Sequence, residues 1–167
     1  MIKAIVCVDE KFGIGKKNDL LFNLLPDMQH FRANTKNSIV VCGYNTLLSF
    51  PNQKPLPGRT TICLCPPEVS RTDCFCIHDF DECVALIKEL SKTTTVWIIG
   101  GAMLYKSMLP YYDEIELTKV YADGDAEAFF PNVDEIPEFE VISENPVEQY
   151  EDLKYQFITY KRKAFYF

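Results

Sequence analysis

Residues 95–105 have the sequence TVWIIGGAMLY, in which an apolar run meets two glycines and a second apolar segment. The first run is rich in β-branched and aromatic residues, which is typical of a buried strand. Gly100 and Gly101 remove side chains where the backbone approaches another group closely, and Pro110 ends the helix that we expect after them. A strand joined to a helix by so short a turn indicates an α/β fold.

Strand-like and helix-like segments alternate over the first two thirds of the chain. The other apolar runs are IKAIVCV at 2–8, SIVVCG at 38–43, TTICLC at 60–65 and CFCI at 74–77. The clearest helix is predicted at 79–90, where Asp79 caps the start and Glu82 stands three residues later. Apolar strands that alternate with helices predict a parallel sheet covered by helices on both faces.

The final third has no clear helical pattern between its strand-like runs, which are EIELTKVYA at 114–122, FEVISE at 139–144 and YQFITYKRK at 155–163. We expect these runs to be antiparallel strands at one edge of the sheet. The fold class is therefore predicted as a single α/β domain over residues 1–167, with a mostly parallel central sheet, flanking helices and an antiparallel C-terminal edge. Residues 161–167 either extend the last strand or form a loose tail.

Composition narrows the class of protein. The net charge of −7 argues against broad nucleic-acid binding, which requires a basic face. No apolar run approaches the length that crosses a bilayer, so we expect no membrane association. Asp9 and Glu10 follow the first apolar run, and no small-residue cleavage site appears, so that run is predicted to be a strand and not a signal peptide. A cytoplasmic location is the resulting expectation.

The seven cysteines are an odd number without a secretion signal, which indicates reduced thiols. The CLC and CFC pairs could be metal ligands, but zinc sites usually separate paired cysteines by two or more residues. Alternation along strands explains the pairs equally well, because residues two apart share a face. We favour small buried apolar side chains and expect no metal.

One acid stands out in LLPDMQHFRANT at 24–35, where Asp27 falls among Leu24, Leu25, Met28 and Phe31 on one side of a predicted helix. Pro26 suits the first helical position, and an acid in the first turn complements the helix dipole. The alternative is a functional carboxylate in a cleft.

Three segments are expected at the carboxyl ends of the strands, where open α/β sheets bind ligands. They are residues 9–23 with Gly13 and Gly15, residues 42–50, in which Asn45 or Thr46 opens a short helix, and the Gly100–Gly101 turn. The helix after Gly100–Gly101 could bind a nucleotide phosphate, although tight strand–helix packing explains the glycines equally well. The stiff turn KPLPGRTTI at 54–62 presents Arg59 to a carboxylate or phosphate, or simply to solvent.

These elements together resemble the dihydrofolate reductase family, from residue 1 to about residue 162. The resemblance is carried by GIGKKNDLLFNL (13–24), PDMQHFRANT (26–35), VVCGYNT (40–46), PLPGRTTI (55–62), IIGGAMLY (98–105), LTKVYADGDAEAFFP (117–131) and YQFITYKRK (155–163). It implies reduction of 7,8-dihydrofolate to 5,6,7,8-tetrahydrofolate by NADPH, which supplies one-carbon carriers for thymidylate and purine synthesis. It also implies a cytoplasmic monomer that binds antifolate-type small molecules.

The resemblance further implies roles for individual residues. The implied catalytic residues are Asp27, which matches the active-site acid, Thr118, its polar partner, and Phe22, a lid position near the acid. The implied substrate-binding residues are Ile5, Cys7, Asp27, Met28, Phe31, Arg59, Ile99 and Thr118, with Arg59 holding the glutamate α-carboxylate of the substrate. The implied cofactor-binding residues are Cys7, Ile14, Gly15, Gly43, Tyr44, Asn45, Thr46, Leu64, Cys65, Ile99, Gly100, Gly101, Ala102, Met103, Leu104 and Tyr105. Residues from about 9 to 24 match the lid.

The chain departs from the family pattern at several positions. Leu21 and Phe22 replace a usual Pro-Trp pair in the lid, and Glu127 replaces a frequent aspartate. The residues that usually bind the cofactor 2′-phosphate are replaced by Tyr44, Cys65, Pro66 and Met103. We therefore expect weak discrimination between NADPH and NADH. The alternatives are a pyrimidine reductase of riboflavin synthesis on the same scaffold, and a binding module without turnover.

Overall fold

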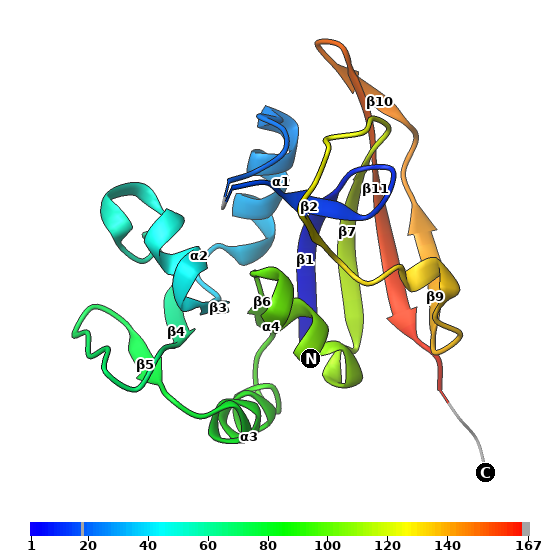
Figure 1. Cartoon of the computed structure of the whole chain (residues 1–167). Coiled ribbons are helices and arrows are strands. Elements are labelled where there is room, and N and C mark those ends of the chain that lie inside the picture. Colours follow the sequence, from blue (N-terminus) through cyan, green and yellow to red (C-terminus); the bar gives the residue numbers. More distant parts are fainter. Residues whose placement is uncertain (18, 165–167) are drawn as a thin grey trace.

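The computed structural model describes residues 1–17 and 19–164 (Figure 1). Its main sheet is built from β1 (Ile2–Val8), β3 (Ile39–Gly43), β4 (Thr60–Leu64), β5 (Phe75–Ile77), β6 (Val96–Ile98), β7 (Glu114–Val120), β9 (Phe139–Glu144), β10 (Glu148–Tyr150) and β11 (Leu153–Arg162). The strand order is β10-β11-β7-β1-β6-β3-β4-β5, and β9 also pairs with β11. The helices are α1 (Leu25–Thr35), α2 (Tyr44–Ser49), α3 (Phe80–Leu90) and α4 (Ala102–Ser107), with short 3-10 turns at Pro51–Gln53, Leu109–Tyr111 and Val133–Glu135.

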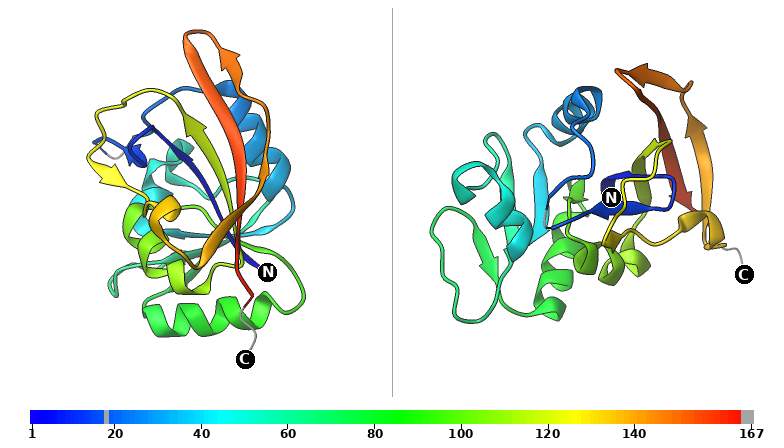
Figure 2. Two further views of the ribbon diagram at one scale, coloured as in Figure 1. Left: turned by 90° about the vertical axis from the view of Figure 1, so that its right-hand side faces the viewer. Right: turned by 45° about the horizontal axis from the view of Figure 1, so that its top comes forward.

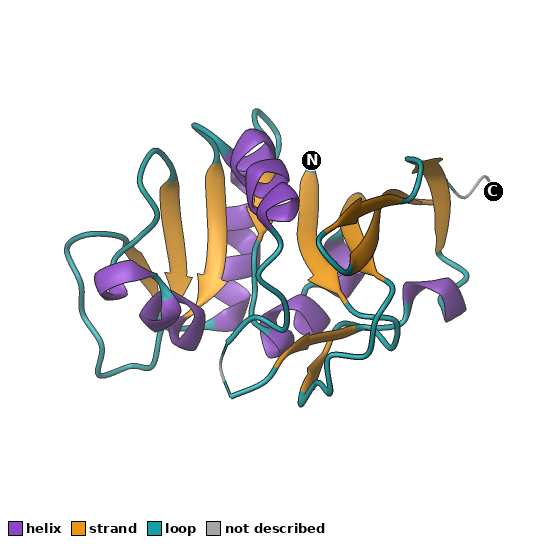
Figure 3. Ribbon diagram, turned by 90° about the horizontal axis from the view of Figure 1, so that it is seen from above, coloured by secondary structure: helices purple, strands orange, loops and turns teal. Residues whose placement is uncertain are grey.

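Helices cover both faces of this sheet, as predicted (Figure 3). Alternate strand residues point to opposite faces, because the side-chain period of a strand is two. Val41 and Ile98 pack on the side of α3 and α4, whereas their neighbours Val40 and Trp97 pack on the side of α1 and α2. The sheet is thus apolar on both sides, which is why its strands have few polar residues.

The parallel part of the sheet extends further than the sequence indicated. β1 pairs in parallel with both β6 and β7, and β3 and β4 continue the parallel set to β5. The expectation that residues 114–122 form an antiparallel strand was half right, because β7 is antiparallel to β11 but parallel to β1. The chain returns to β7 through α4 on one face and therefore enters in the same direction as β1. The antiparallel edge begins at β11, beside which β9 and β10 lie (Figure 2).

The predicted helices are present with small differences at their ends. Asp79 caps α3 by accepting a hydrogen bond from the backbone N–H of Glu82, as expected. The short helix α2 begins at Tyr44, with Gly43 as its N-cap and no side-chain cap. The prediction that Asn45 or Thr46 opens this helix was therefore wrong by one or two residues.

A second, small sheet was not predicted. β2 (Gly13–Gly15) pairs in antiparallel fashion with β8 (Ala128–Phe129), which joins the predicted lid to the segment after β7. The strand β11 includes Lys161 and Arg162, and the predicted tail at 165–167 lies outside the described residues.

The cysteines are free thiols, and four of them, Cys42, Cys63, Cys65 and Cys83, are buried. Within residues 1–17 and 19–164, no helix has the length and apolar character needed to cross a membrane.

Candidate active site

Asp27 lies in the first turn of α1, directly after Pro26. Asp27 therefore complements the helix dipole and also faces a cleft. The expectation of one continuous apolar side was only partly right. Leu24 is buried, at 2% exposure, but Leu25 is 44% exposed and Met28 is 36% exposed.

The cleft at Asp27 is formed where the predicted lid meets the ends of β1 and α1. Its lining residues are Cys7, Ile14, Leu20, Leu21, Phe22, Leu24, Asp27 and Met28. Thr118 on β7 donates a hydrogen bond from Oγ1 to Asp27 Oδ1 at 2.7 Å. Cys7 and Thr118 are register partners on the neighbouring strands β1 and β7, so the sheet itself places both side chains under the carboxylate.

Burial raises the pKa of Asp27 above its ordinary value, because the surrounding apolar side chains disfavour the charged form. The hydrogen bond from Thr118, the charge of His30 and a hydrogen bond from Cys7 each oppose this rise. The pKa of the Cys7 thiol is raised by burial and by the nearby Asp27 charge, so Cys7 stays a neutral donor beside the acid. The site therefore holds a carboxyl group whose charged form is less favoured than that of an exposed aspartate.

His30 was not singled out from the sequence, although it follows Asp27 by three residues on α1 and so lies on the same side of the helix. Its ring stacks on Phe157 of β11, with centroids 4.1 Å apart. This contact fixes the imidazole near Asp27, and the pairing of β7 with β11 sets its position.

Arg59 lies at the far end of α1 and is held on two sides. Its Nε donates to Thr35 Oγ1 at 3.1 Å and its Nη1 donates to the carbonyl of Pro57 at 2.6 Å. The guanidinium also lies 5.8 Å from the ring centroid of Phe31. Thr35 was missed in the sequence, although it stands four residues after Phe31 and eight after Asp27, on the same side of the helix.

A groove next to Arg59 is lined by Arg32, Lys36, Asn37, Pro57, Gly58 and Arg59. In the described part of the chain, no ion pair involves Arg32, Lys36 or Arg59. Burial and the charge of Arg32 lower the pKa of the Arg59 guanidinium. This end of the site is therefore suited to a ligand that carries carboxylates.

The carboxyl ends of β3 and β6 form a second region, where two backbones approach each other closely. The N–H of Gly43 donates to the carbonyl of Gly100 at 2.8 Å. A Cβ atom on Gly101 would lie 3.2 Å from Thr46 Oγ1, which is tighter than ordinary packing, and Gly100 has φ +124°. These glycines leave the N-terminal ends of α2 and α4 side by side without covering side chains.

The predicted cofactor residues divide into accessible and buried ones. Met103 is 85% exposed and Asn45 is exposed, whereas Leu104 is only 5% exposed and packs in the core under α4. Leu104 can thus contribute only its backbone. Tyr105 is also buried, and its hydroxyl donates to the carbonyl of Ile5 at 2.7 Å.

The other predicted site residues lie near these two regions. Ile5, Ile99 and Cys65 are buried in the core on the α1–α2 side, against which Phe31 and Tyr44 pack. Gly15 lies in β2, Leu64 ends β4, and Ala102 is the first residue of α4.

Tyr44 has a charged neighbour that the sequence analysis missed. Arg71, in the loop between β4 and β5, lies near Tyr44. Arg71 pairs with Asp73 at 2.7 Å and donates to the carbonyl of Gln53 at 2.6 Å. The positive charge of Arg71 near Tyr44 is therefore already neutralised by Asp73.

The metal hypothesis for the cysteine pairs gains no support from side-chain placement. Among residues 1–17 and 19–164, no group of three or more His, Cys, Asp or Glu side chains is arranged to hold a metal ion.

The chain is similar to dihydrofolate reductases over almost its whole length. The family model described as dihydrofolate reductase matches residues 1–162. A viral dihydrofolate reductase of Saimiriine herpesvirus 2 (strain 488) is 29% identical, covering 97% of this chain and 85% of the relative. A putative dihydrofolate reductase of Caenorhabditis elegans is 31% identical, with 96% of both chains covered.

A solved structure agrees with these sequence matches. The dihydrofolate reductase from Enterococcus faecalis, complexed with NADP(H) and RAB-propyl, has a TM-score of 0.86 and 26% identity, covering 98% of this chain and 97% of that chain.

The environment of Asp27 predicts a pH-dependent gain of stability in Asp27→Asn. A folded-state pKa above the unfolded value gives stability that is present below the unfolded pKa and is lost as pH rises through the folded pKa. At neutral pH the ionised wild-type carboxylate therefore costs stability, and the neutral amide removes this cost. We expect a higher Tm for the variant at pH 7–8, by about 2–4 °C for each kcal/mol gained, and no gain near pH 3. A pH-independent difference in Tm would contradict this explanation.

Proposed function

This chain belongs to the dihydrofolate reductase family, and we propose that Asp27 is the acid on which its reaction depends. That reaction is the reduction of 7,8-dihydrofolate to 5,6,7,8-tetrahydrofolate by hydride transfer from a nicotinamide cofactor. The observation that carries the proposal is the half-buried carboxylate of Asp27 in the cleft, bonded to Thr118 at 2.7 Å.

The chemistry explains why a carboxylate belongs here. Dihydrofolate accepts hydride at C6 far more readily when its N5 atom is protonated. A carboxylate in a cleft of low polarity holds a protonated heterocycle more strongly than water does. Asp27 accepts hydrogen bonds from N3 and the 2-amino group of the pterin ring, and it polarises the ring while a water molecule delivers the proton to N5.

Thr118 and Cys7 support this role from the sheet. Thr118 donates to Oδ1, and because a carboxylate has about four acceptor sites over its two oxygens, the group can still accept bonds from the pterin ring. Because both neighbours lie on paired strands, they hold the carboxylate with little freedom of movement. Phe22, Met28, Ile5 and Phe31 provide the apolar walls around the ring.

The opposite end of the substrate lies at Arg59. Its guanidinium binds the glutamate α-carboxylate, because Thr35 and Pro57 hold it in a fixed orientation and leave Nη2 free for a ligand. Arg32 and Lys36 add positive charge to the same groove. An acidic protein with net charge −7 thus keeps a local basic surface for an anionic tail.

The ends of β3 and β6 fit a dinucleotide. The uncovered backbone at Gly43, Gly100 and Gly101 can approach a pyrophosphate, and the neighbouring helix ends offer N–H donors. When bound, the nicotinamide cofactor supplies the hydride. Tyr44, Asn45 and Thr46 would hold the cofactor on the α2 side, Leu64 and Cys65 at the end of β4, and Ile99 to Tyr105 on the α4 side. Cys7, Ile14 and Gly15 lie toward its nicotinamide end.

The proposal also covers the oligomeric state, the location and the binding partners of the protein. We infer a single-domain monomer of the cytoplasm that binds dihydrofolate and antifolate-type molecules and does not bind nucleic acid. The acidic net charge of −7 supports the last point. Light scattering of the purified chain at micromolar concentration checks the monomer.

Loss of absorbance by NADPH in the presence of dihydrofolate tests the reaction. We expect turnover by the wild type and a fall in kcat/KM of about 10²–10⁴-fold in Asp27→Asn at neutral pH, the range typical of acid–base groups. Lys92→Gln, which removes a charge from the exposed Lys92–Glu89 pair, is the control. Undiminished turnover in Asp27→Asn would refute the role of this acid, and binding without turnover in the wild type would indicate a binding module.

Removal of the Arg59 charge should weaken substrate binding more than catalysis. We expect Arg59→Gln to raise the KM for dihydrofolate by about 10–100-fold with kcat changed little, because a charge-assisted hydrogen bond contributes about 1.5–3 kcal/mol. Thr35→Val should raise KM less, since it only loosens the guanidinium. Added salt should raise KM in the wild type and have less effect in Arg59→Gln. Equal salt dependence in the two proteins would contradict the assignment.

The preference between NADPH and NADH should depend on the charged residues near Tyr44. Because Asp73 already neutralises Arg71, we expect kcat/KM values for NADPH and NADH within about tenfold of each other, since no free charge-assisted bond to the 2′-phosphate is available. Tyr44→Arg and Asp73→Asn should each shift the ratio toward NADPH, the first by supplying a cation and the second by releasing one. Parallel assays with both cofactors measure this ratio. A several-hundredfold preference for NADPH in the wild type would refute the prediction.

A further inference from the structure

We propose that Asp9 is a positioning residue that holds the lid closed over the reacting groups by tying the β2 hairpin to the loop between β7 and β8. This proposal rests on the proposed function. It concerns a side chain that neither the substrate assignment nor the cofactor assignment uses.

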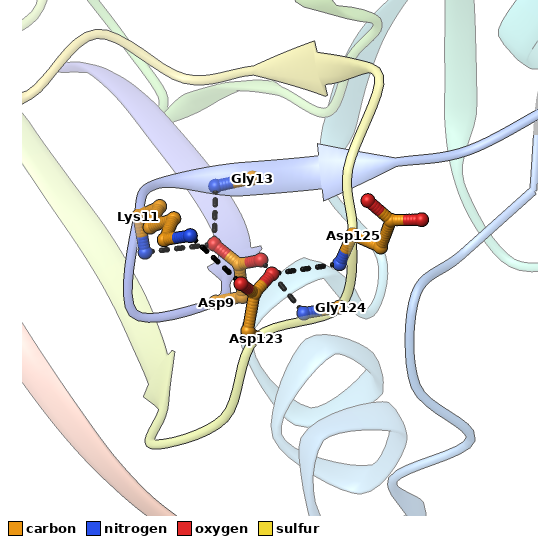
Figure 4. A network of polar contacts seen from close by, with 6 residues as sticks. All are labelled: Asp9, Lys11, Gly13, Asp123, Gly124 and Asp125. Carbon is orange, nitrogen blue, oxygen red and sulfur yellow. Dashed lines mark hydrogen bonds and ion pairs between the residues drawn. The ribbon is translucent and has the colours of Figure 1, made fainter.

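Asp9 lies at the carboxyl end of β1 and is only 1% exposed. Its Oδ1 accepts backbone hydrogen bonds from Lys11 at 2.8 Å and from Gly13 at 2.7 Å. Its Oδ2 accepts a backbone hydrogen bond from Gly124 at 3.0 Å. One carboxylate thus satisfies three N–H groups from two segments that are more than a hundred residues apart (Figure 4).

The geometry requires a carboxylate at this position. Both of its oxygens are acceptors, whereas an amide of the same shape places an NH2 group on one side. In Asp9→Asn, that NH2 would face either the donors of the hairpin or the N–H of Gly124. At least one buried backbone donor would then lose its partner, which is costly in a site that excludes water.

The space around Asp9 is closely filled. A Cβ atom on Gly13 would clash with Ala126 Cβ and would lie 2.9 Å from each Asp9 oxygen. The hairpin and the loop therefore meet so closely at Gly13 that no residue with a side chain fits there. Asp9 is the buried centre of the contact.

The two segments are also joined by the pairing of β2 with β8 and by backbone hydrogen bonds from Glu10 to Ala122 at 3.1 Å and from Glu127 to Gly15 at 2.9 Å. The ion pairs between them are more exposed than Asp9. Lys11 pairs with Asp123 at 2.8 Å and Lys16 pairs with Asp125 at 2.8 Å, with Asp125 88% exposed. Exposed ion pairs of this kind contribute little, because solvent screens them. The bond from Gly124 to Asp9 is therefore a buried side-chain contact that adds to this backbone pairing in the closed arrangement.

Loss of the contact at Asp9 should affect the active site through Ile14. This residue follows Gly13 and lines the cleft with Cys7 and Asp27. If the tie at Asp9 is lost, the closed lid becomes less populated, and a ligand that requires it binds more weakly by the same factor. The effect should fall on the cofactor, beside which Ile14 lies, more than on the carboxylate tail at Arg59.

Limited trypsin digestion of the ligand-free protein tests the tie without any turnover. We expect cleavage after Lys16 and Lys17 to be about tenfold faster or more in Asp9→Asn than in wild type, with cleavage after Lys92 unchanged. The matched control is Asp125→Asn, which removes an exposed acid from the same contact and should cleave like wild type. Equal cleavage in Asp9→Asn and Asp125→Asn would overturn the proposal, and so would uniformly faster cleavage at all sites.

Binding measurements separate positioning from simple destabilisation. We expect the Kd for NADPH to rise about tenfold in Asp9→Asn, while the Kd for dihydrofolate changes less than twofold. Equal loss of both affinities would contradict the proposal. Failure of the wild type to turn over dihydrofolate would refute the proposed function but leave the digestion result standing.

Hydrogen exchange in the wild type keeps the proposal testable if Asp9→Asn does not fold. The amide of Gly124 should exchange much more slowly than an exposed loop amide, because it is bonded to a buried carboxylate. Exchange of the Gly124 amide at the rate of an exposed loop would show that the tie does not form.

Discussion

The molecule depends on one constraint, which is that a carboxylate must be kept partly out of water without losing all of its hydrogen bonds. Burial of Asp27 disfavours its charged form and raises its pKa, whereas interactions with Thr118, His30 and Cys7 stabilise the charged form and lower the pKa. Too much burial would leave a neutral acid with weak influence on the pterin ring that we propose it binds. Too much exposure would leave an ordinary surface carboxylate. The surrounding structure holds the side chain between these limits.

The fold supplies each of these contacts from a different element. The pairing of β1 with β7 places Cys7 and Thr118 below the acid, and the first turn of α1 presents the acid itself. The same helix carries Thr35 at its other end, where it holds Arg59. One helix on a parallel sheet therefore sets the distance between the two ends of the proposed substrate site. Rigid elements position such sites more precisely than loops do.

Local sequence patterns predicted the features that depend on interactions between residues close in sequence. The cap at Asp79 and the strand–glycine–helix turn at Gly100 both depend on neighbours in sequence, and both are present. The pairing of β2 with β8, the parallel pairing of β7 with β1 and the bond from Gly124 to Asp9 depend on residues distant in sequence, and none was predicted. Family resemblance pointed to Asp27, to its partner Thr118 and to Arg59. Thr35, which holds Arg59, emerges only when helix and turn are brought together.

The most direct test of this account is an NMR titration of the Asp27 side-chain carboxyl carbon in the ligand-free protein. The account predicts a midpoint above that of an ordinary aspartate, because burial outweighs the bonds from Thr118 and Cys7. It also predicts a further rise in Thr118→Val, where a bond that stabilises the charged form is removed. A midpoint at or below the ordinary value, unchanged in Thr118→Val, would contradict the account.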